Sequence, residues 1–327
     1  MPKALLKLFL MLICFTFSAT SFAVIDELKG KSPAGLLRLG DGVLFPPYAL
    51  VVDKSKKKIH VIDNTSGTPI ALETYDSDLG KNAGDKLSQG DHKTPEGIYF
   101  LETKLEGSNL DAFKYGVRAF TTNYPNFFDQ KLSKGGSGIW LHAIDDSVTL
   151  ERGSRGCVVV RNDTIKKISQ FITLRETPIM IFDKVTWLPS AVVKKESDMI
   201  LKYLSAWKQS WESKDINSYI QYYADDFKFG KMSRNQFKKY KQGLAEKYQE
   251  IKVSLSMPVI YEHKDYMVVR FLQDYTSTDH ADFGAKTLYL KKMNGRFLIL
   301  NEEWREATDP NTKALLAGNN LCCQTHN

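Results

Sequence analysis

The chain has 327 residues, of which 43% are hydrophobic and 25% are charged, with a formal net charge of +7. This composition is typical of globular proteins and excludes an intrinsically disordered chain, and the length predicts two domains of ordinary size. A modest positive excess suits an anionic polymer or surface. The sequence contains no nucleic-acid-binding motif, so we expect no nucleic-acid partner.

Residues 1–23 have the three parts of a secretory signal peptide. Lys3 and Lys7 give a positive start, Leu8–Phe17 is an apolar core, and Ser21–Ala23 is a small-residue cleavage site. The apolar run is too short to be a comfortable membrane span. We therefore expect the protein to be exported to the periplasm and its signal peptide, with Cys14, to be removed.

Residues 24–47 are expected to form an N-terminal helical leader with two short helices, Ile25–Leu28 and Pro33–Leu39. The leucines of the second helix make an apolar face with no obvious partner in so short a segment. That face must pack on the next domain or on another subunit. A homodimer through residues 24–47 is one expectation.

From Tyr48 the pattern becomes that of β-strands, and residues 48–185 are predicted to form a mainly β domain. A long polar and aromatic connection, residues 103–137, is typical of a lid or binding loop. The expected strands are Tyr48–Val52, Ile59–Ile62, Ala71–Asp76, Tyr99–Glu102, Ile139–His142 and Pro178–Phe182.

A linker at residues 186–195 precedes a second domain at 196–306, and residues 307–327 form a polar tail. Helices followed by a strand meander predict an α+β domain. The expected helices are Glu196–Lys214, Ile216–Tyr223 and Ser233–Ile251, and the expected strands are Val253–Tyr261, Tyr266–Thr276, Lys286–Lys292 and Arg296–Trp304.

A cysteine and a histidine stand beside apolar strand-like runs in the first domain. His142 ends one run, and Cys157 follows a turn and begins the next. A thiol becomes a nucleophile as a thiolate, for which it needs a base within hydrogen-bond reach. The alternative is that both residues are plain core. Cys322 and Cys323 are adjacent in the tail, which suits neither a structural disulfide nor a closed metal site, so we expect no bound metal.

At Thr94-Pro-Glu-Gly-Ile-Tyr99, Ile139-Trp-Leu-His142 and Ser154-Arg-Gly-Cys157 the sequence resembles the L,D-transpeptidase (YkuD) catalytic domain. The resemblance covers about residues 48–183. It implies a YkuD-like β-sandwich that acts on peptidoglycan stem peptides without a cofactor. Enzymes of this family attack the L,D-bond after the third stem residue and form a thioester, which water or an amine then resolves.

The resemblance also implies roles for individual residues. Cys157 corresponds to the nucleophile and His142 to its general base, with the backbone carbonyl of Ala143 orienting the histidine. The N–H groups of Gly156 and Cys157 would face the oxyanion. Most members have histidine where this chain has Arg155, whose guanidinium could hold a substrate carboxylate in a bidentate fashion. The expected substrate-binding residues are Arg155, Ser154, Trp140 and Tyr99.

The whole layout, with an NTF2-like second domain, resembles the L,D-carboxypeptidases that set helical cell shape in Helicobacter and Campylobacter. This implies removal of the terminal D-alanine from tetrapeptide stems, leaving tripeptides. One alternative is a transpeptidase that cross-links stems or attaches a protein to them. Another is a non-catalytic wall-binding protein whose second domain uses its aromatic residues, Trp207, Trp211, Tyr219, Tyr222, Tyr223, Phe227 and Phe229.

Overall fold

The structure is a computed structural model that describes residues 27–65, 67–148, 151, 153–307, 312–314, 316 and 321. The predicted signal peptide and three cysteines, Cys14, Cys322 and Cys323, lie outside the described residues. Within the described part of the chain, no helix is both long and apolar enough to cross a membrane.

The first domain is built on eight strands in the order β5-β4-β3-β10-β6-β7-β8-β9. The strand β6 belongs to both halves of this ladder, pairing first with β10 and then, after a register irregularity, with β7. The strands are β3 (Tyr48–Asp53), β4 (Lys58–Asp63), β5 (Ile70–Asp76), β6 (Gly97–Glu106), β7 (Arg118–Thr122), β8 (Trp140–Ile144), β9 (Val158–Arg161) and β10 (Pro178–Phe182).

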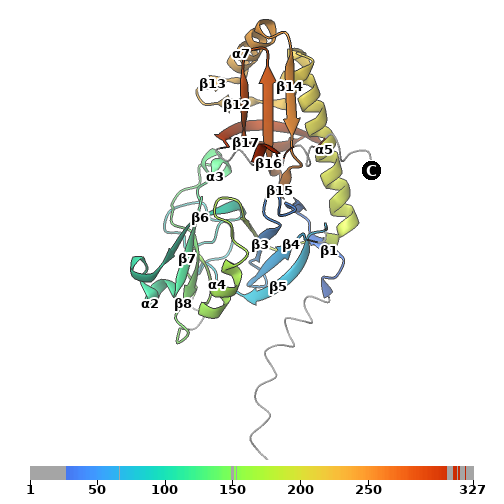
Figure 1. Ribbon diagram of the computed structural model, residues 1–327. Helices are drawn as coiled ribbons and strands as arrows, with labels where there is room; N and C mark the ends of the chain where they lie inside the picture. Colours follow the sequence, from blue (N-terminus) through green and yellow to red (C-terminus); the bar gives the residue numbers. More distant parts are fainter. Residues whose placement is uncertain are drawn as a thin grey trace, which may run out of the picture.

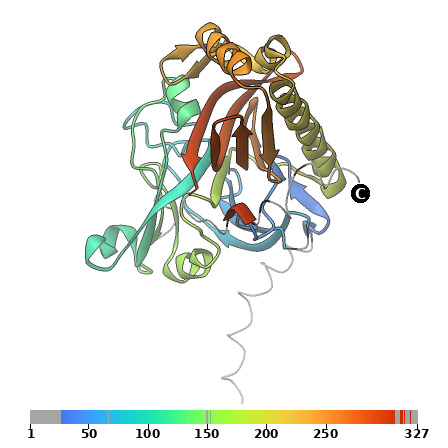
Figure 2. The same ribbon diagram turned by 45° about the horizontal axis from the view of Figure 1, so that its top comes forward.

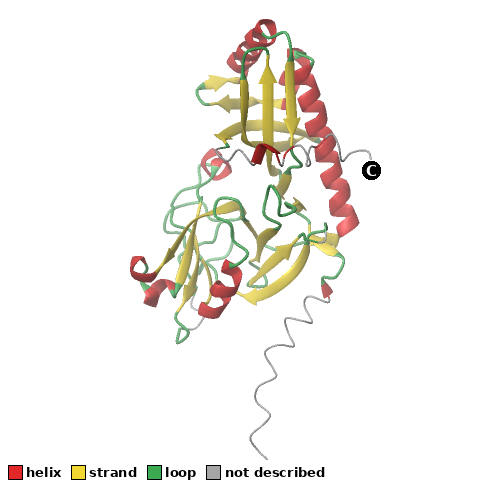
Figure 3. Cartoon of the chain, viewed as in Figure 1, coloured by secondary structure: helices red, strands yellow, loops and turns green. Residues whose placement is uncertain are grey.

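Side chains from both halves of the ladder meet in one core, which includes Leu50, Tyr99 and Leu141. The strands β3 and β10 pair in parallel, and both carry unbroken apolar runs, as expected of strands buried on two faces. The predicted mainly β sandwich is confirmed, and strands dominate this domain in Figure 3.

Short helices interrupt the segment that was expected to be one long connection. Residues 103–137 contain the end of β6, all of β7 and three short helices, so they are not one long connection without secondary structure. The helices of this domain are η1 (Gly107–Asn109), α2 (Ala112–Tyr115), α3 (Phe127–Lys131) and α4 (Asn162–Ser169). Asn126 begins α3 through a capping box with Asp129, a local signal that sequence reading can detect.

The second domain places the helices α5, α6 and α7 against a mainly antiparallel sheet in which β12 and β18 pair in parallel, as the α+β prediction required. Its sheet order is β13-β12-β18-β17-β16-β15-β2, with β14 also paired to β16. The elements are α5 (Ser190–Glu212), α6 (Ile216–Tyr219), η3 (Ile220–Tyr222), β12 (Tyr223–Phe229), β13 (Met232–Ser233), α7 (Arg234–Lys247), β14 (Ile251–Leu255), β15 (Val259–His263), β16 (Tyr266–Ser277), β17 (Ala281–Met293) and β18 (Arg296–Glu306).

The long helix α5 runs beside the sheet and reaches the first domain at its lower end (Figures 1 and 2). Its buried side chains recur every three or four residues, at Ile200, Leu204, Trp207 and Trp211, which is the spacing of one helix face. Several boundaries differ from prediction; for example, α7 ends at Lys247 rather than at Ile251. Tyr223 begins a strand instead of ending a helix, and the expected strand at residues 253–261 is broken in two before Pro258, which cannot donate to the ladder.

The expected N-terminal helical leader is wrong. Residues 27–47 contain two strands instead: β1 (Lys31–Pro33) pairs with β11 (Trp187–Pro189), and β2 (Leu36–Arg38) pairs with β15 of the second domain. The leucines at 36, 37 and 39 are each at most 4% exposed, because the chain covers them itself. The premise of the homodimer prediction therefore fails.

The proposed linker and tail also need correction. Residues 187–189 form β11 and α5 begins at Ser190, so little of 186–195 is linker. In the tail, Leu316 and Leu321 are buried against the two domains, which a purely polar tail would not show.

The two domains share an apolar interface. One cluster combines Val51 and Met180 of the first domain with Tyr261 and Leu300 of the second. At its edge, Arg270 pairs with Glu176 at 3.0 Å, with side chains 9% and 20% exposed. Apolar packing and an ion pair thus hold the first and second domains together.

Candidate active site

Cys157 lies in the turn that leads into β9, and a second segment holds that turn from the side. Ser154 N–H donates to Leu79 O at 2.7 Å, and Lys81 N–H donates to Ser154 O at 3.0 Å. Gly153 N–H donates to the carboxylate of Asp78 at 2.8 Å. The backbone of the cysteine turn is therefore fixed by residues 78–81 before any substrate binds.

Gly156 is required by the close approach of a third segment. Its φ is +126°, and a Cβ at this position would lie 2.6 Å from the carbonyl oxygen of Lys93. Only glycine combines that backbone conformation with that contact. The Thr94-Pro-Glu-Gly stretch and the Arg-Gly-Cys stretch, far apart in sequence, are consequently packed backbone to backbone.

Ser154 organises the turn from within. Its hydroxyl donates to the carbonyl oxygen of Cys157 at 2.7 Å and accepts the N–H of Gly156 at 3.0 Å. The Ser154 hydroxyl and the Gly156 N–H therefore both form hydrogen bonds within the turn, which contradicts two expectations. Ser154 positions the turn rather than binding substrate, and the Gly156 amide is directed at Ser154 rather than at an oxyanion.

His142 lies on β8 and is only 4% exposed. Its Nδ1 is 2.5 Å from the carbonyl oxygen of Ala143, the contact that the predicted orienting role of Ala143 requires. A carbonyl accepts only from an N–H, so Nδ1 carries the proton and Nε2 is the basic nitrogen of the neutral ring. The ring of Tyr115 meets the imidazole edge to face at 5.1 Å and restricts its rotation.

Strand register brings Cys157 and His142 to the same face of the sheet. The strands β8 and β9 are parallel neighbours with Leu141 opposite Val158, and both of these side chains point into the core. Side chains alternate along a strand, so Cys157 and His142 point to the other face as diagonal neighbours. Diagonal pairs are within reach of long and aromatic side chains. This register places the thiol and the imidazole on one face of the sheet.

The thiol itself is held in its neutral form. Burial raises the pKa of Cys157 to about 11, despite opposing effects of the Trp140 backbone N–H and the positive charge of Lys86. Its Sγ lies 3.6 Å from the carbonyl oxygen of Gly138, which suits an S–H donor. A thiol in this state needs a base at the moment of attack.

Buried ion pairs support the segments around the site. Lys86 is 3% exposed and donates to Asp91 at 2.7 Å. Lys134, with a side chain 4% exposed, bridges Asp85 at 2.8 Å and Asp129 at 3.1 Å. Such pairs hold loops in register because losing one partner would leave a buried charge uncompensated.

Tyr99 belongs to that support and not to a substrate surface. It is fully buried, and its hydroxyl lies 3.2 Å from Asp129 and 3.3 Å from the carbonyl oxygen of Glu96. The prediction that Tyr99 binds substrate is therefore wrong. The alternating pattern of the strand could not reveal which face of β6 is covered.

Arg155 and Trp140 remain in positions open to a ligand. Arg155 is exposed and directly precedes the Gly156-Cys157 pair. Trp140 is half-buried and its ring lies 4.9 Å from that of Tyr115. Tyr115 contacts both Trp140 and His142, and the sequence analysis missed it. The neighbouring Gly116 is a sequence signal that the backbone here approaches another segment closely, because a side chain at this position would collide with Ala143.

The second domain has a cavity of about 410 Å³ with mixed aromatic and charged walls. Lys241 lies over the ring of Trp211 at 4.2 Å, and burial lowers the pKa of this lysine to about 8. Tyr275 Oη and Asp282 Oδ1 are buried without a hydrogen-bond partner among the described residues. Of the aromatic residues singled out from sequence, the ones that line this cavity are Trp207, Trp211, Tyr219 and Phe229.

Among the described residues, no group of three or more His, Cys, Asp or Glu side chains is placed to hold a metal ion.

The fold and the cysteine turn define a two-domain protein, in which a β-sandwich with a cysteine and a histidine on one sheet face precedes an NTF2-like domain. Residues 47–181 match the L,D-transpeptidase catalytic domain (YkuD), and residues 199–303 match the Cds6 C-terminal NTF2-like domain. The chain belongs to the L,D-transpeptidase (YkuD) family, in the form that carries a C-terminal NTF2-like domain.

Solved structures share both domains. Bd1075 of Bdellovibrio bacteriovorus is 43% identical, with a TM-score of 0.79 over 85% of this chain and 99% of that one. The helical cell shape determining protein Pgp2 of Campylobacter jejuni, as its K307A mutant, is 26% identical, with a TM-score of 0.64 over 85% of this chain and 96% of that one. Among curated proteins no sequence matches the chain. These similarities support a function related to peptidoglycan.

Proposed function

We propose that this protein is a peptidoglycan L,D-carboxypeptidase that removes the terminal D-alanine from tetrapeptide stems and leaves tripeptides. The observation that carries the proposal is the similarity to Pgp2, a helical cell shape determining protein, across both domains. We further propose that the protein acts in the periplasm and takes part in remodelling the wall and setting cell shape.

In the proposed reaction, Nε2 of His142 removes the thiol proton as Cys157 Sγ attacks the carbonyl carbon before D-alanine. The tetrahedral intermediate collapses, the C–N bond breaks, and the imidazolium returns its proton to the amine of departing D-alanine. Water, deprotonated by His142, then attacks the thioester and releases the tripeptide carboxylate and the thiol. With the Gly156 amide used by Ser154, the Cys157 amide is the remaining candidate for the oxyanion.

Arg155 is proposed to hold the free carboxylate of D-alanine, because it is exposed beside the nucleophile and a guanidinium binds carboxylates bidentately. The Arg155→Gln variant should raise KM for a tetrapeptide stem and leave KM unchanged for the same stem with a C-terminal amide. Equal effects on both substrates would remove Arg155 from the substrate carboxylate.

The reaction itself is tested with purified protein and disaccharide tetrapeptide, with products identified by mass. Tripeptide and free D-alanine are expected, and Cys157→Ser should form neither. Cross-linked dimers without tripeptide would instead establish the transpeptidase alternative. Full activity of Cys157→Ser would show that the first domain is not the catalyst.

Wall binding by the second domain is the other candidate function, and the aromatic cavity around Trp211 and Lys241 favours it. Stacking surfaces beside charged groups suit a polar, saccharide-containing polymer. Binding to isolated sacculi should weaken in Trp211→Ala but persist in Cys157→Ser. Unchanged binding of Trp211→Ala would exclude this cavity.

A further inference from the structure

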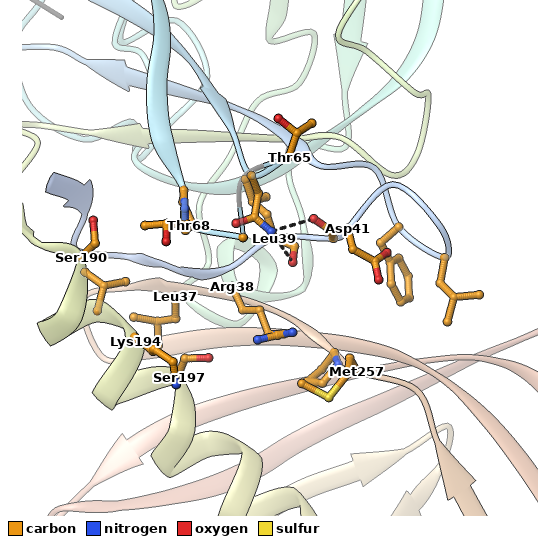
Figure 4. A pocket seen from close by; sticks show the side chains of 18 of the residues that line it. Leu37, Arg38, Leu39, Asp41, Thr65, Thr68, Ser190, Lys194, Ser197 and Met257 are labelled. Carbon is orange, nitrogen blue, oxygen red and sulfur yellow. Dashed lines mark hydrogen bonds between the residues drawn. The ribbon is translucent and has the colours of Figure 1, made fainter. Parts of the chain in front are cut away.

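A second cavity, of about 400 Å³, lies where the N-terminal strands, the first domain and α5 meet. Its walls come from residues 37–45, from the turn between β4 and β5, from the start of α5 and from the turn before β15 (Figure 4). It is separate from the cysteine turn and from the aromatic cavity, because it shares no lining residue with either.

Arg38 lines this cavity together with two other charged residues, Asp41 and Lys194. It lies on β2 opposite Ile260 of β15, and its side chain points towards α5 and Met257 (Figure 4). Its Nε is buried without a hydrogen-bond partner among the described residues. Burial lowers the pKa of the Arg38 guanidinium, and the carboxylates of Asp41 and Asp198 only offset this effect.

Those two carboxylates are occupied elsewhere. Asp198 pairs with Lys194 at 2.9 Å, and Asp41 accepts the backbone N–H of Val43 at 2.9 Å. Within the described residues neither forms an ion pair with Arg38. The buried Nε of Arg38 has no partner among the described residues, and a bound anion that accepted its N–H would recover the cost of desolvating it.

Ser197 supplies a second unused polar group. It lies on α5, is 3% exposed, and its Oγ has no hydrogen-bond partner among the described residues. Figure 4 shows its hydroxyl on the same side of the cavity as the Arg38 guanidinium. A buried hydroxyl and a guanidinium whose Nε is buried, on one side of the same cavity, form a built anion site rather than a solvated surface.

The rest of the wall is mixed. Polar side chains, among them Asn64, Thr65 and Thr68, line part of it, and Leu44, Phe45, Val193, Met257 and Pro258 form an apolar part. An inorganic anion would leave these surfaces uncovered, whereas a carboxylate attached to an apolar group would cover them. A planar carboxylate also matches the fork of a guanidinium.

We propose that this cavity binds a small monocarboxylate with a compact apolar body, whose carboxylate pairs with Arg38 and accepts a hydrogen bond from Ser197. The ligand would contact both domains and the N-terminal strands at once. The proposal does not depend on the function assigned to Cys157. Two sources share this chemistry, a short-chain fatty acid and the carboxyl end of an apolar amino acid.

Calorimetric titration of the full chain with hexanoate, N-acetylleucine and hexanamide tests the proposal. At least one acid should bind, and hexanamide, which has the shape of hexanoate without its charge, should bind about tenfold more weakly or not at all. Preference for hexanoate or for N-acetylleucine identifies the source. Equal binding of hexanoate and its amide, or no binding of either acid, would overturn the proposal.

Variants locate the binding. Arg38→Gln and Ser197→Ala should each weaken acid binding, Arg38→Gln by about tenfold or more. Arg118→Gln, which removes a surface guanidinium paired with Glu106 outside the cavity, is the matched control and should bind normally. Because Ser197→Ala removes a single buried hydroxyl, it keeps the test valid even if Arg38→Gln does not fold. Full binding by a folded Arg38→Gln protein would refute the assignment.

Discussion

The reactivity of Cys157 should reveal whether its thiol is neutral at rest and is deprotonated only during attack. Burial raises the pKa of this thiol to about 11 from its usual value near 9. The perturbation is His142→Gln, which removes the proposed base but keeps a polar side chain of similar size. Alkylation by iodoacetamide reports the resting thiolate, whereas tetrapeptide cleavage reports the assisted attack.

The expected size follows from the pKa. At pH 8 a thiol of pKa about 11 is thiolate in about one molecule in a thousand, whereas a thiol of pKa 9 is thiolate in about one in ten. Folded protein should therefore be alkylated at Cys157 about a hundredfold more slowly than denatured protein at pH 8. The rate in folded protein should rise about tenfold per pH unit and level off near pH 11.

The assay follows the peptide that contains Cys157 by mass spectrometry, because the sequence has 4 cysteines. His142→Gln should leave this alkylation profile unchanged but slow cleavage by about a hundredfold or more. A plateau of alkylation between pH 6 and 8 that disappears in His142→Gln would refute the reasoning. Such a plateau would mean that the resting site is a thiolate–imidazolium pair.

Three further predictions concern the supports of the site. Gly156→Ala should lower stability by about 2–5 kcal/mol in denaturant unfolding, because the alanine would add backbone strain and collide with Lys93. Gly90 also has a positive φ, +80°, but no atom lies near the position of its Cβ, so Gly90→Ala should lower stability only by the strain of about 1–2 kcal/mol. Lys54 and Lys264 both pair with Glu96, at 2.9 and 3.0 Å, but their side chains are 8% and 60% exposed. Lys54→Ala should therefore lower the free energy of unfolding by about 3 kcal/mol and Lys264→Ala by less than about 1 kcal/mol. Equal losses of stability would contradict this ranking. Ser154→Ala should lower kcat by about tenfold with little change in KM, because the turn loses its internal hydrogen bonds; a change in KM alone would return Ser154 to substrate binding.

The elements that could be predicted from the sequence are those whose pattern is set by neighbouring residues. The strands β3 and β4 and the buried face of α5 were readable because strand patterns and helical spacing are properties of neighbouring residues. The placement of His142 in one apolar strand-like run and of Cys157 in the turn before the next followed from motifs with short, specific spacing.

Non-local pairing explains what could not be predicted. Leu36–Arg38 has the composition of a helix, but it gains its hydrogen bonds from β15, which lies in the other domain. The burial of Tyr99 depends on Asp129, and the engagement of Gly156 depends on a single rotamer of Ser154. Each of these outcomes is decided by a partner that no local window contains.

The pairing of β2 with β15 has a consequence for biogenesis. Because β2 precedes the first domain in the chain and its partner follows it, the first domain is an insertion within the sheet of the second. The N-terminal strand is made early and stays unpaired until β15, at residues 259–263, is available to it. A chain truncated before β15 would therefore retain an exposed strand edge that quality-control proteases can recognise.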